Sequence, residues 1–232
     1  MKILALDTST EACSAALLID GEVRERYQEA PREHGALILP MMTELLAEAG
    51  ITPSQLDALA FGRGPGAFVG VRIATGVAQG IAFAADLPVI PVSSLAALAQ
   101  GAGRSHVYTA IDARMNEVYW GAYVKNVQGV VELLGDERVS PPDQVTADDD
   151  SHADPAPQWY GVGSGWGAYA DVLSQRLTNL AGYDAQRFPS AKYIAQIAQH
   201  DFIQGRCVDP VDALPTYLRN NVAKKSADQK PQ

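Results

Sequence analysis

The sequence predicts an α/β protein built from two similar domains, and three observations support that prediction. Short apolar runs typical of strands alternate with helical stretches along the chain, as expected when helices cover the faces of a sheet. A length of 232 residues allows one large or two small domains, at about 100–200 residues per domain. The chain contains the same series of elements twice: a strand, a turn that begins with Asp, a second strand, a turn with glycine, and a third strand. The Asp is Asp7 in the first series and Asp112 in the second.

The two similar stretches are three-stranded meanders. The expected strands are residues 3–6, 13–19 and 22–28 in the first meander and 107–111, 118–124 and 130–135 in the second. The pair Asp20-Gly21 is a hairpin signal, and Gly129 marks the corresponding turn. Their separation is far longer than the roughly 20–50 residues of a solenoid repeat. The similarity therefore indicates a duplicated domain, with chance resemblance of two meanders as the alternative.

Helices and further strands fill the rest of the chain. Helices are expected over residues 34–50, 70–86, 94–103 and 190–205, short strands over 56–62 and 87–93, and a strand, glycine-rich turn and helix over 159–173. Gly50 followed by Pro53 marks the end of the first helix. This alternation predicts layers of helix and sheet.

The first two helices carry more apolar surface than one buried face requires. A surface helix needs an apolar stripe roughly 100° wide, whereas the first helix is apolar more widely around its axis, at Leu37, Ile38, Leu39, Met41, Met42, Leu45 and Leu46. In the second helix Gly76, Gly80 and Ala84 recur every fourth residue and allow close approach of another backbone. Either these helices are buried within their own domain or they form a protein–protein interface.

Composition and charge exclude several classes of protein. Apolar residues make up 47% and charged residues 19% of the chain, as in ordinary globular proteins. A net charge of -9 disfavours an independent nucleic-acid surface, which needs clustered Lys and Arg. Cys13 and Cys207 form no Cys-x-x-Cys pair, which fits a reducing cytosol. The apolar helix between Arg72 and Asp86 is shorter than the ~18 residues of a membrane span, so we expect a cytoplasmic protein.

The glycine-rich segment 61–76 has the layout of a phosphate loop. A strand, a turn with Gly64 and Gly66, and a helix follow one another, and backbone N–H groups at such a turn can bind an anion. However, the segment lacks the Gly-Lys-Ser/Thr ending of a Walker loop and the spacing of the dinucleotide motif. Asp7 and Thr8 open a second candidate phosphate turn, although Asp at a strand end is commonly only a turn former.

No complete catalytic set is present in the sequence. The four histidines are scattered, and Ser164 misses the G-x-S-x-G pattern because Val162 occupies the position of the first glycine. The run Asp148 to Asp150 is a weak candidate for a cation site, since such sites need ligands that converge from a turned loop.

Four segments together resemble one family. The stretches ILALDTST, GRGPGAFVGVR, IDARMNEVYW and LPTYLRNNVAKK are similar to those of the TsaB family, also called YeaZ, in the actin-like, sugar-kinase and Hsp70 (ASKHA) superfamily. The resemblance implies a fold of two ribonuclease H-like domains, the second smaller. We expect the domains to span residues 1–103 and 104–218, with the last helix able to pack back on the first domain, and a flexible tail over 219–232.

The resemblance also implies a function without catalysis. TsaB-like proteins are expected to support threonylcarbamoylation of the tRNA adenosine next to the anticodon as the partner of TsaD, with TsaE in a ternary complex, TsaC supplying threonylcarbamoyl-adenylate, and a homodimer when alone. ATP or ADP and metal are expected on the partner subunits, and tRNA only through the complex. Where TsaD-like proteins place two metal-binding histidines, this chain has Ser94 and Leu98, and Leu98 offers a cation no lone pair.

One departure from the family pattern concerns the glycine loop. Its usual Gly-Pro-Gly-Ser-Phe-Thr-Gly has Ala67 and Val69 here in place of the hydroxyl residues. We therefore interpret Asp7, Thr8, Gly64 and Gly66 as remnants of phosphate loops that lead into the interface helix. The predicted contacts with the partner are Leu39, Met42, Leu46, Ile73, Val77 and Gly80. A metallopeptidase and a small-molecule kinase of the same fold are the alternatives.

Overall fold

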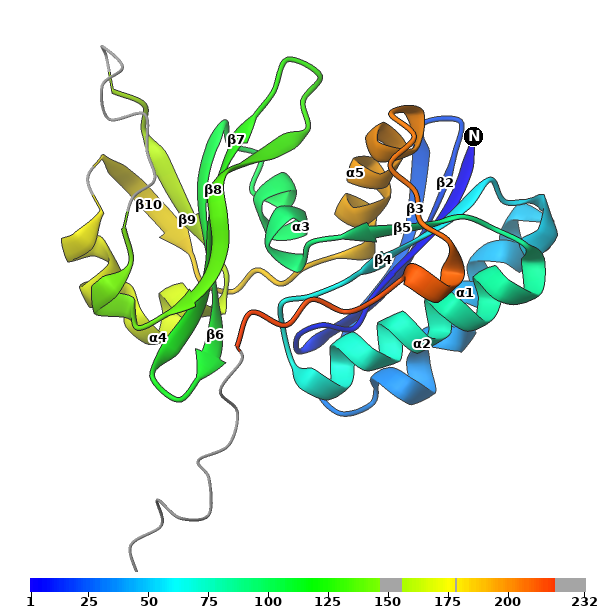
Figure 1. Ribbon diagram of the computed structural model, residues 1–232, viewed down its shortest axis with the longest axis horizontal. Helices are drawn as coiled ribbons and strands as arrows, with labels where there is room; N and C mark the ends of the chain where they lie inside the picture. Colours follow the sequence, from blue (N-terminus) through cyan, green and yellow to red (C-terminus); the bar gives the residue numbers. More distant parts are fainter. Residues whose placement is uncertain (147–155, 178, 220–232) are drawn as a thin grey trace, which may run out of the picture.

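The computed structural model describes residues 1–146, 156–177 and 179–219, and it contains two five-stranded sheets (Figure 1). The first sheet has the order β3-β2-β1-β4-β5 and the second the order β10-β9-β6-β7-β8. The strands of the first sheet are β1 (Lys2–Asp7), β2 (Ala12–Ile19), β3 (Glu22–Glu29), β4 (Ala58–Gly62) and β5 (Val89–Val92). Those of the second are β6 (His106–Arg114), β7 (Glu117–Lys125), β8 (Val131–Ser140), β9 (Trp159–Val162) and β10 (Leu180–Asp184).

The two sheets have the same topology. In the first, β1 pairs antiparallel with β2 and parallel with β4. In the second, β6 pairs antiparallel with β7 and parallel with β9. The predicted duplication and the two-domain ASKHA-type fold are thereby confirmed, while strand β10 was not predicted because its sequence LAGYD contains no apolar run.

Five α-helices cover the sheets. They are α1 (His34–Ala49), α2 (Phe68–Ala85), α3 (Ser94–Gly101), α4 (Ser164–Arg176) and α5 (Ala191–Ile203), joined by three short 3₁₀ turns, η1 (Pro53–Gln55), η2 (Pro142–Gln144) and η3 (Pro210–Asp212), within the described residues. Helices α1 and α2 pack on one face of the first sheet and α5 on the other. Helices α3 and α4 lie on opposite faces of the second sheet. As a result, α3 follows a strand of the first sheet but packs on the second, and α5 follows a strand of the second sheet but packs on the first.

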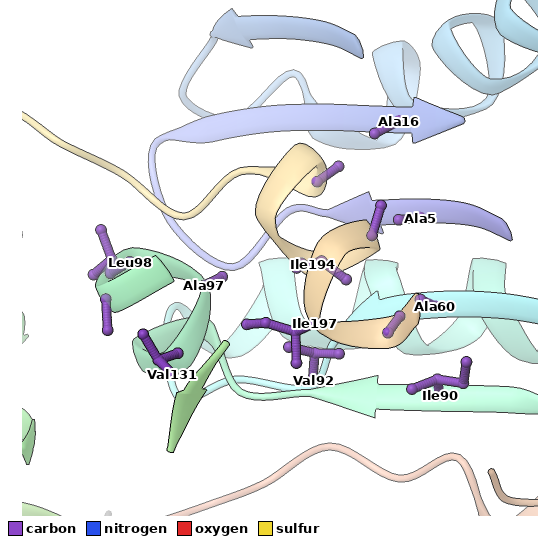
Figure 2. Close-up of a cluster of buried hydrophobic side chains, with 14 of the residues drawn as sticks. Ala5, Ala16, Ala60, Ile90, Val92, Ala97, Leu98, Val131, Ile194 and Ile197 are labelled. Atoms are coloured by element: carbon purple, nitrogen blue, oxygen red, sulfur yellow. The ribbon is translucent and has the colours of Figure 1, made fainter. Parts of the chain in front are cut away.

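One apolar core runs through both sheets because of this exchange. Ile3 and Ala5 of β1 pack against α5, and Val107 and Ile111 of β6 belong to the same cluster. Figure 2 shows α5 against the first sheet, with Ile194 among that sheet's side chains, and Leu98 of α3 in the same cluster. The expected boundary at residue 103 therefore separates the strands of the two sheets but not the helices that cover them.

Polar groups of the first sheet hold the start of α5. The backbone N–H of Ala191 donates to Ser14 Oγ (2.9 Å), and the N–H of Lys192 donates to a carboxylate oxygen of Glu25 (3.0 Å), which also accepts from Ser190 Oγ (2.5 Å). A carboxylate at a helix N-terminus satisfies free N–H groups and opposes the positive end of the helix dipole. The returning helix is thus fixed by hydrogen bonds as well as by burial.

Helix α2 is longer than the sequence indicated. It begins at Phe68 and has 18 residues, so within the described residues it is the one helix with the length and composition of a membrane span. The expected start at residue 70 was therefore too late. A third of this helix (33%) is buried inside the protein, where Ala74, Ala78 and Ala82 face the sheet.

Candidate functional site

A cleft of about 750 Å³ lies between the two sheets. Its walls come from the β1–β2 turn, the segment before α1, the start of α2, the β6–β7 turn, the start of α4 and the C-terminal segment 216–219. The charged lining residues are Glu11, Arg32, Arg72, Asp112, Arg114 and Arg219. The duplicated turns after β1 and β6 therefore meet at one site.

The first turn and the glycine loop are packed against each other without space for a ligand. Thr8 Oγ1 donates to the carbonyl of Gly70 (2.6 Å), and the N–H of Ala67 donates to the carbonyl of Ser9 (2.7 Å). A Cβ atom added at Gly70 would lie 1.9 Å from the Thr8 carbonyl oxygen, and one at Gly66 would lie 2.2 Å from that of Ser9. The close contact between the two turns requires glycine at both positions. Binding of a phosphate is therefore not needed to explain these glycines.

Asp7 lies beneath the cleft. It is fully buried, and burial raises the pKa of its carboxyl to about 6 despite hydrogen bonds to Oδ1 from the N–H (3.0 Å) and Oγ (2.9 Å) of Ser9. Oδ2 has no hydrogen-bond partner in the described residues and faces Gly62, where an added Cβ would lie 1.8 Å away. Its neighbour Cys13 is also buried, and desolvation followed by the nearby Asp7 charge raises the pKa of that thiol to about 11.

Of the four predicted phosphate-loop residues, only Gly66 lines the cleft. Asp7 and Thr8 are completely buried. Gly64 has a positive φ of 93°, precedes a cis peptide bond to Pro65, and packs on the backbone of Thr216. Their interpretation as remnants of phosphate loops stays a prediction, and the glycines here bring the two backbones into contact.

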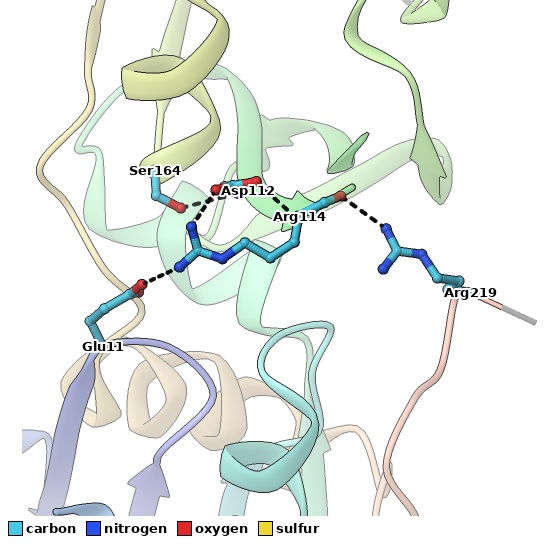
Figure 3. Close-up of polar contacts among 5 residues, drawn as sticks. All are labelled: Glu11, Asp112, Arg114, Ser164 and Arg219. Carbon is cyan, nitrogen blue, oxygen red and sulfur yellow. Dashed lines mark hydrogen bonds and ion pairs between the residues drawn. The ribbon is translucent and has the colours of Figure 1, made fainter. Parts of the chain in front are cut away.

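The second turn is exposed and reaches across the cleft. Arg114, Met115 and Asn116 all have positive φ values (60°, 58° and 59°). This conformation directs the Arg114 guanidinium to Asp112 Oδ2 (2.8 Å) and to Glu11 Oε1 of the first turn (3.4 Å), as Figure 3 shows. The two halves of the duplication are therefore joined by an ion pair between equivalent turns.

Ser164 has a structural role at this turn. Its Oγ accepts the backbone N–H of Asp112 (3.1 Å), which ties the start of α4 to the end of β6 (Figure 3). Ser164 also lacks the G-x-S-x-G context of a nucleophile, and this hydrogen bond accounts for its position.

The C-terminal segment 213–219, which we call the strap, crosses from the first sheet to the second. Gln79 Nε2 donates to the carbonyl of Ala213 (3.0 Å), and the N–H of Thr216 donates to the carbonyl of Arg63 (2.8 Å). At its far end the Arg219 guanidinium binds Glu117 Oε2 (2.5 Å) and donates to the carbonyl of Arg114 (3.3 Å), the contact that Figure 3 shows. Arg219 was expected in the flexible tail, but its side chain is only 14% exposed. Sequence reasoning missed the strap, for which the motif LPTYLR was the sole signal.

Aromatic and cationic groups line the mouth of the cleft. The Arg72 guanidinium lies 3.5 Å from the centre of the Phe68 ring and donates to Tyr217 Oη (2.8 Å). Two nearly buried side chains, Thr10 and His34, have an enclosed polar atom (Oγ1 and Nε2) without a partner in the described residues. The cleft thus presents hydrogen-bond donors that suit an anion, and its arginines are largely engaged by protein groups.

The positions expected to bind metal in TsaD-like proteins lie in the core. Ser94 is fully buried, and Leu98 is 1% exposed within the shared apolar cluster. Within residues 1–146, 156–177 and 179–219, no three His, Cys, Asp or Glu side chains are grouped as a metal site would require. The aspartates 148–150 lie outside the described residues.

Comparisons with known proteins identify the family. A protein-family model described as "TsaD: tRNA N6-adenosine threonylcarbamoyltransferase" matches residues 27–226. Proteins named tRNA threonylcarbamoyladenosine biosynthesis protein TsaB from Haemophilus influenzae and Escherichia coli are each 43% identical, over 97% of this chain and 96% and 97% of theirs. The solved structure of YeaZ from Pseudomonas aeruginosa superposes with a TM-score of 0.86 at 47% identity, covering 94% of this chain and 99% of that one. The chain belongs to the TsaB family.

In this TsaB-family chain the predicted interface residues divide into two groups. Leu39 (49% exposed) and Gly80 are on the surface, and Ile73 and Val77 are half-buried. Met42 (2% exposed) and Leu46 (9%) instead face the sheet together with Ile38, Met41 and Leu45. Their assignment to the interface is therefore corrected. Apart from Leu39, the exposed residues of α1 are small or polar, and they are Gly35, Ala36, Pro40, Thr43, Glu44, Ala47 and Glu48.

Proposed function

We propose that this chain is a non-catalytic subunit required for threonylcarbamoylation of the tRNA adenosine next to the anticodon, and that it acts by binding TsaD. TsaB-named relatives, with "tRNA threonylcarbamoyladenosine biosynthesis" in their names, support the pathway. Support for the partner role comes from the outer surface of α1 and α2.

The observation that carries this proposal is a row of glycines on α2 with nothing opposite them. Gly76 and Gly80 are exposed, and a Cβ added at either would meet no atom within 4 Å. The protein's own packing therefore does not require glycine there, although glycine in a helix interior is destabilising by about 1 kcal/mol relative to alanine. Small residues at this spacing permit close packing of a helix from another subunit.

Large apolar side chains flank this row. Phe83 at the end of α2 is 84% exposed, Val69 at its start is 67% exposed, and Leu39 of α1 is 49% exposed. Contiguous apolar surface with a polar rim is typical of protein–protein interfaces. We assign TsaD to this face, and a second copy of the chain when TsaD is absent.

The absence of catalysis is proposed from the residues at the site. Ser94 and Leu98 stand where the resemblance places metal-binding histidines, and both are enclosed in the core. Accordingly, ATP or ADP and metal are assigned to the partner subunits, TsaE to a ternary complex, and tRNA to a surface formed with TsaD. Because the pathway modifies tRNA, the chain is assigned to the cytoplasm.

Reconstitution tests this function. Modified adenosine is measured in a mixture of this chain, TsaD, TsaC, TsaE, tRNA, threonine, bicarbonate and ATP, and then with each protein omitted. We expect product to require both this chain and TsaD. Undiminished product when this chain is left out would overturn the proposal. Stoichiometric zinc or iron in the purified chain would favour the peptidase alternative, and micromolar ATP affinity would favour the kinase alternative.

A further inference from the structure

A second cavity of about 230 Å³ lies between the two sheets and shares no lining residue with the cleft. Its walls come from the end of β4, the β5–α3 junction, the β7–β8 hairpin, the end of α5 and the segment that follows α5. This volume is smaller than the roughly 300–1,000 Å³ of pockets for drug-sized ligands. The cavity suits a molecule of few heavy atoms.

Glu137 of β8 provides the negative side of the cavity. Its carboxylate accepts hydrogen bonds from the hydroxyls of Ser93 and Tyr123. Burial, and then the Glu137 charge, raise the pKa of Tyr123 well above its usual value, so the phenol stays protonated and donates. An ionised carboxylate has about four lone-pair sites, so Glu137 can accept further donors from a ligand.

Arg63, directly after β4, provides the positive side. Its guanidinium lines the cavity but makes no side-chain hydrogen bond or ion pair within the described residues, and Nε is enclosed without a partner. An enclosed donor left unpaired costs free energy. A planar carboxylate is the group that best matches a guanidinium fork.

The other charged lining groups are paired with protein groups. Arg206 binds Asp201 Oδ1 (2.6 Å), and Glu132 accepts a hydrogen bond from Asn126 Nδ2 (2.8 Å). With two arginines and three acids, the formal charges of the lining sum to −1. The net negative charge of the lining disfavours a simple anion. A zwitterion has no net charge, so the lining does not repel it as a whole.

We propose that this cavity binds a free α-amino acid, with its carboxylate on Arg63 and its ammonium group toward Glu137. The site lies where both sheets and α5 contribute side chains, so its occupation ties the two sheets together. This inference does not depend on the proposed function, because it concerns a small molecule bound by the isolated chain.

Titration of the ¹⁵N-labelled chain by NMR tests this site, with glycine, L-alanine and L-serine as zwitterions and with acetate and methylammonium as half-ligands. We expect saturable shifts of amides around the cavity, with at least one zwitterion binding about tenfold or more tighter than acetate, as a charge-assisted hydrogen bond contributes. No shifts around the cavity up to tens of millimolar would overturn the proposal.

Three variants locate the binding. Arg63→Met should abolish binding of both the zwitterions and acetate, whereas Glu137→Gln should weaken the zwitterions about tenfold or more while acetate still binds. Arg24→Met is the matched control, because Arg24 is exposed on β3 at the opposite edge of the first sheet. Folding of each variant is checked from its amide spectrum. Zwitterion binding that persists unchanged in a folded Arg63→Met chain would contradict the assignment.

Discussion

The turns that follow β1 and β6 occupy equivalent places in the two sheets, yet they have opposite environments. In the first, Asp7, Thr8 and Ser9 are completely buried beneath the glycine loop. In the second, Met115 is 72% exposed and the Arg114 side chain is 74% exposed. The glycine-rich segment after β9 packs on Ala110 of β6, which lies before the second turn, so Arg114 and Met115 stay exposed and Arg114 reaches across the cleft.

This difference shows how one supersecondary unit can serve two purposes. The buried turn is part of the core, and its residue choice is set by sterics, as the close approach of Gly66 and Gly70 shows. The exposed turn is an interdomain contact whose residue choice is set by charge, as Arg114 pairing with Glu11 shows. Substitutions in the first turn should therefore affect stability far more than those in the second.

The largest effect is expected from Gly70→Ala. The added Cβ would lie 1.9 Å from the Thr8 carbonyl oxygen, and such overpacking should lower the free energy of unfolding by about 3 kcal/mol or more. Gly76→Ala in the same helix is the control, because open space surrounds that position, and it should stabilise by up to about 1 kcal/mol. Urea denaturation measures both. Equal effects of the two substitutions would refute the account of the glycine loop.

The substitution Asp7→Asn tests the burial of the first turn through the pH dependence of stability. Because the folded pKa of about 6 lies above the ordinary 3.8, the native state binds the proton more tightly, and stability falls as pH rises from about 4 to 6. The unfolding free energy of the chain minus that of Asp7→Asn should therefore decrease by up to about 3 kcal/mol between pH 4 and pH 8. Urea melts across this range give the difference. A constant difference would show that the carboxyl titrates normally.

Arg219→Met tests the strap that spans the two sheets. The pair with Glu117 is largely enclosed, with side-chain exposures of 14% and 30%, and its loss should cost about 2 kcal/mol. Hydrogen exchange at the N–H of Thr216, which donates to Arg63, should accelerate at the same time. Unchanged exchange at this amide would show that Arg219 does not hold the strap.

The smallest effect is expected from Arg114→Gln in the exposed turn. The Arg114 side chain in its ion pairs with Glu11 and Asp112 is 74% exposed, so the loss should be below about 1 kcal/mol and should diminish with added salt. Thermal melts at low and high ionic strength measure it. A loss as large as that of Gly70→Ala would remove the contrast between the two turns.

Much of the fold could be predicted from local sequence, but long-range packing could not. The meanders, the Asp20-Gly21 hairpin and the left-handed cap at Gly50 follow from residue type and were found as expected. Strand β10 was not predicted because its sequence LAGYD, with a glycine and an aspartate, shows no alternation of apolar and polar residues. The exchange of α3 and α5 between sheets depends on contacts between residues distant in sequence, which no local pattern reports.

The candidate interface shows the same limit. Apolar residues on α1 predicted a second contact, but periodicity alone did not show that Met42 and Leu46 already face the sheet. Gly76 and Gly80 lie on an open face of α2, and the contact that their spacing suggested stays a prediction. The motifs IDARMNEVYW and LPTYLR contain Arg114 and Arg219, but no local pattern predicted their partners Glu11 and Glu117, which lie in other parts of the fold.

The measurement that tests the central claim most directly is the affinity of TsaD for Gly80→Leu, compared with the unaltered chain by calorimetry. Ala168→Leu, at an exposed position of α4, is the matched control, and amide spectra confirm that both variants are folded. We predict that Gly80→Leu weakens binding by about a hundredfold or more, as expected for a clash at the centre of an interface, while the control binds normally. Equal affinity of all three chains would contradict the assignment of α1 and α2 as the partner-binding face.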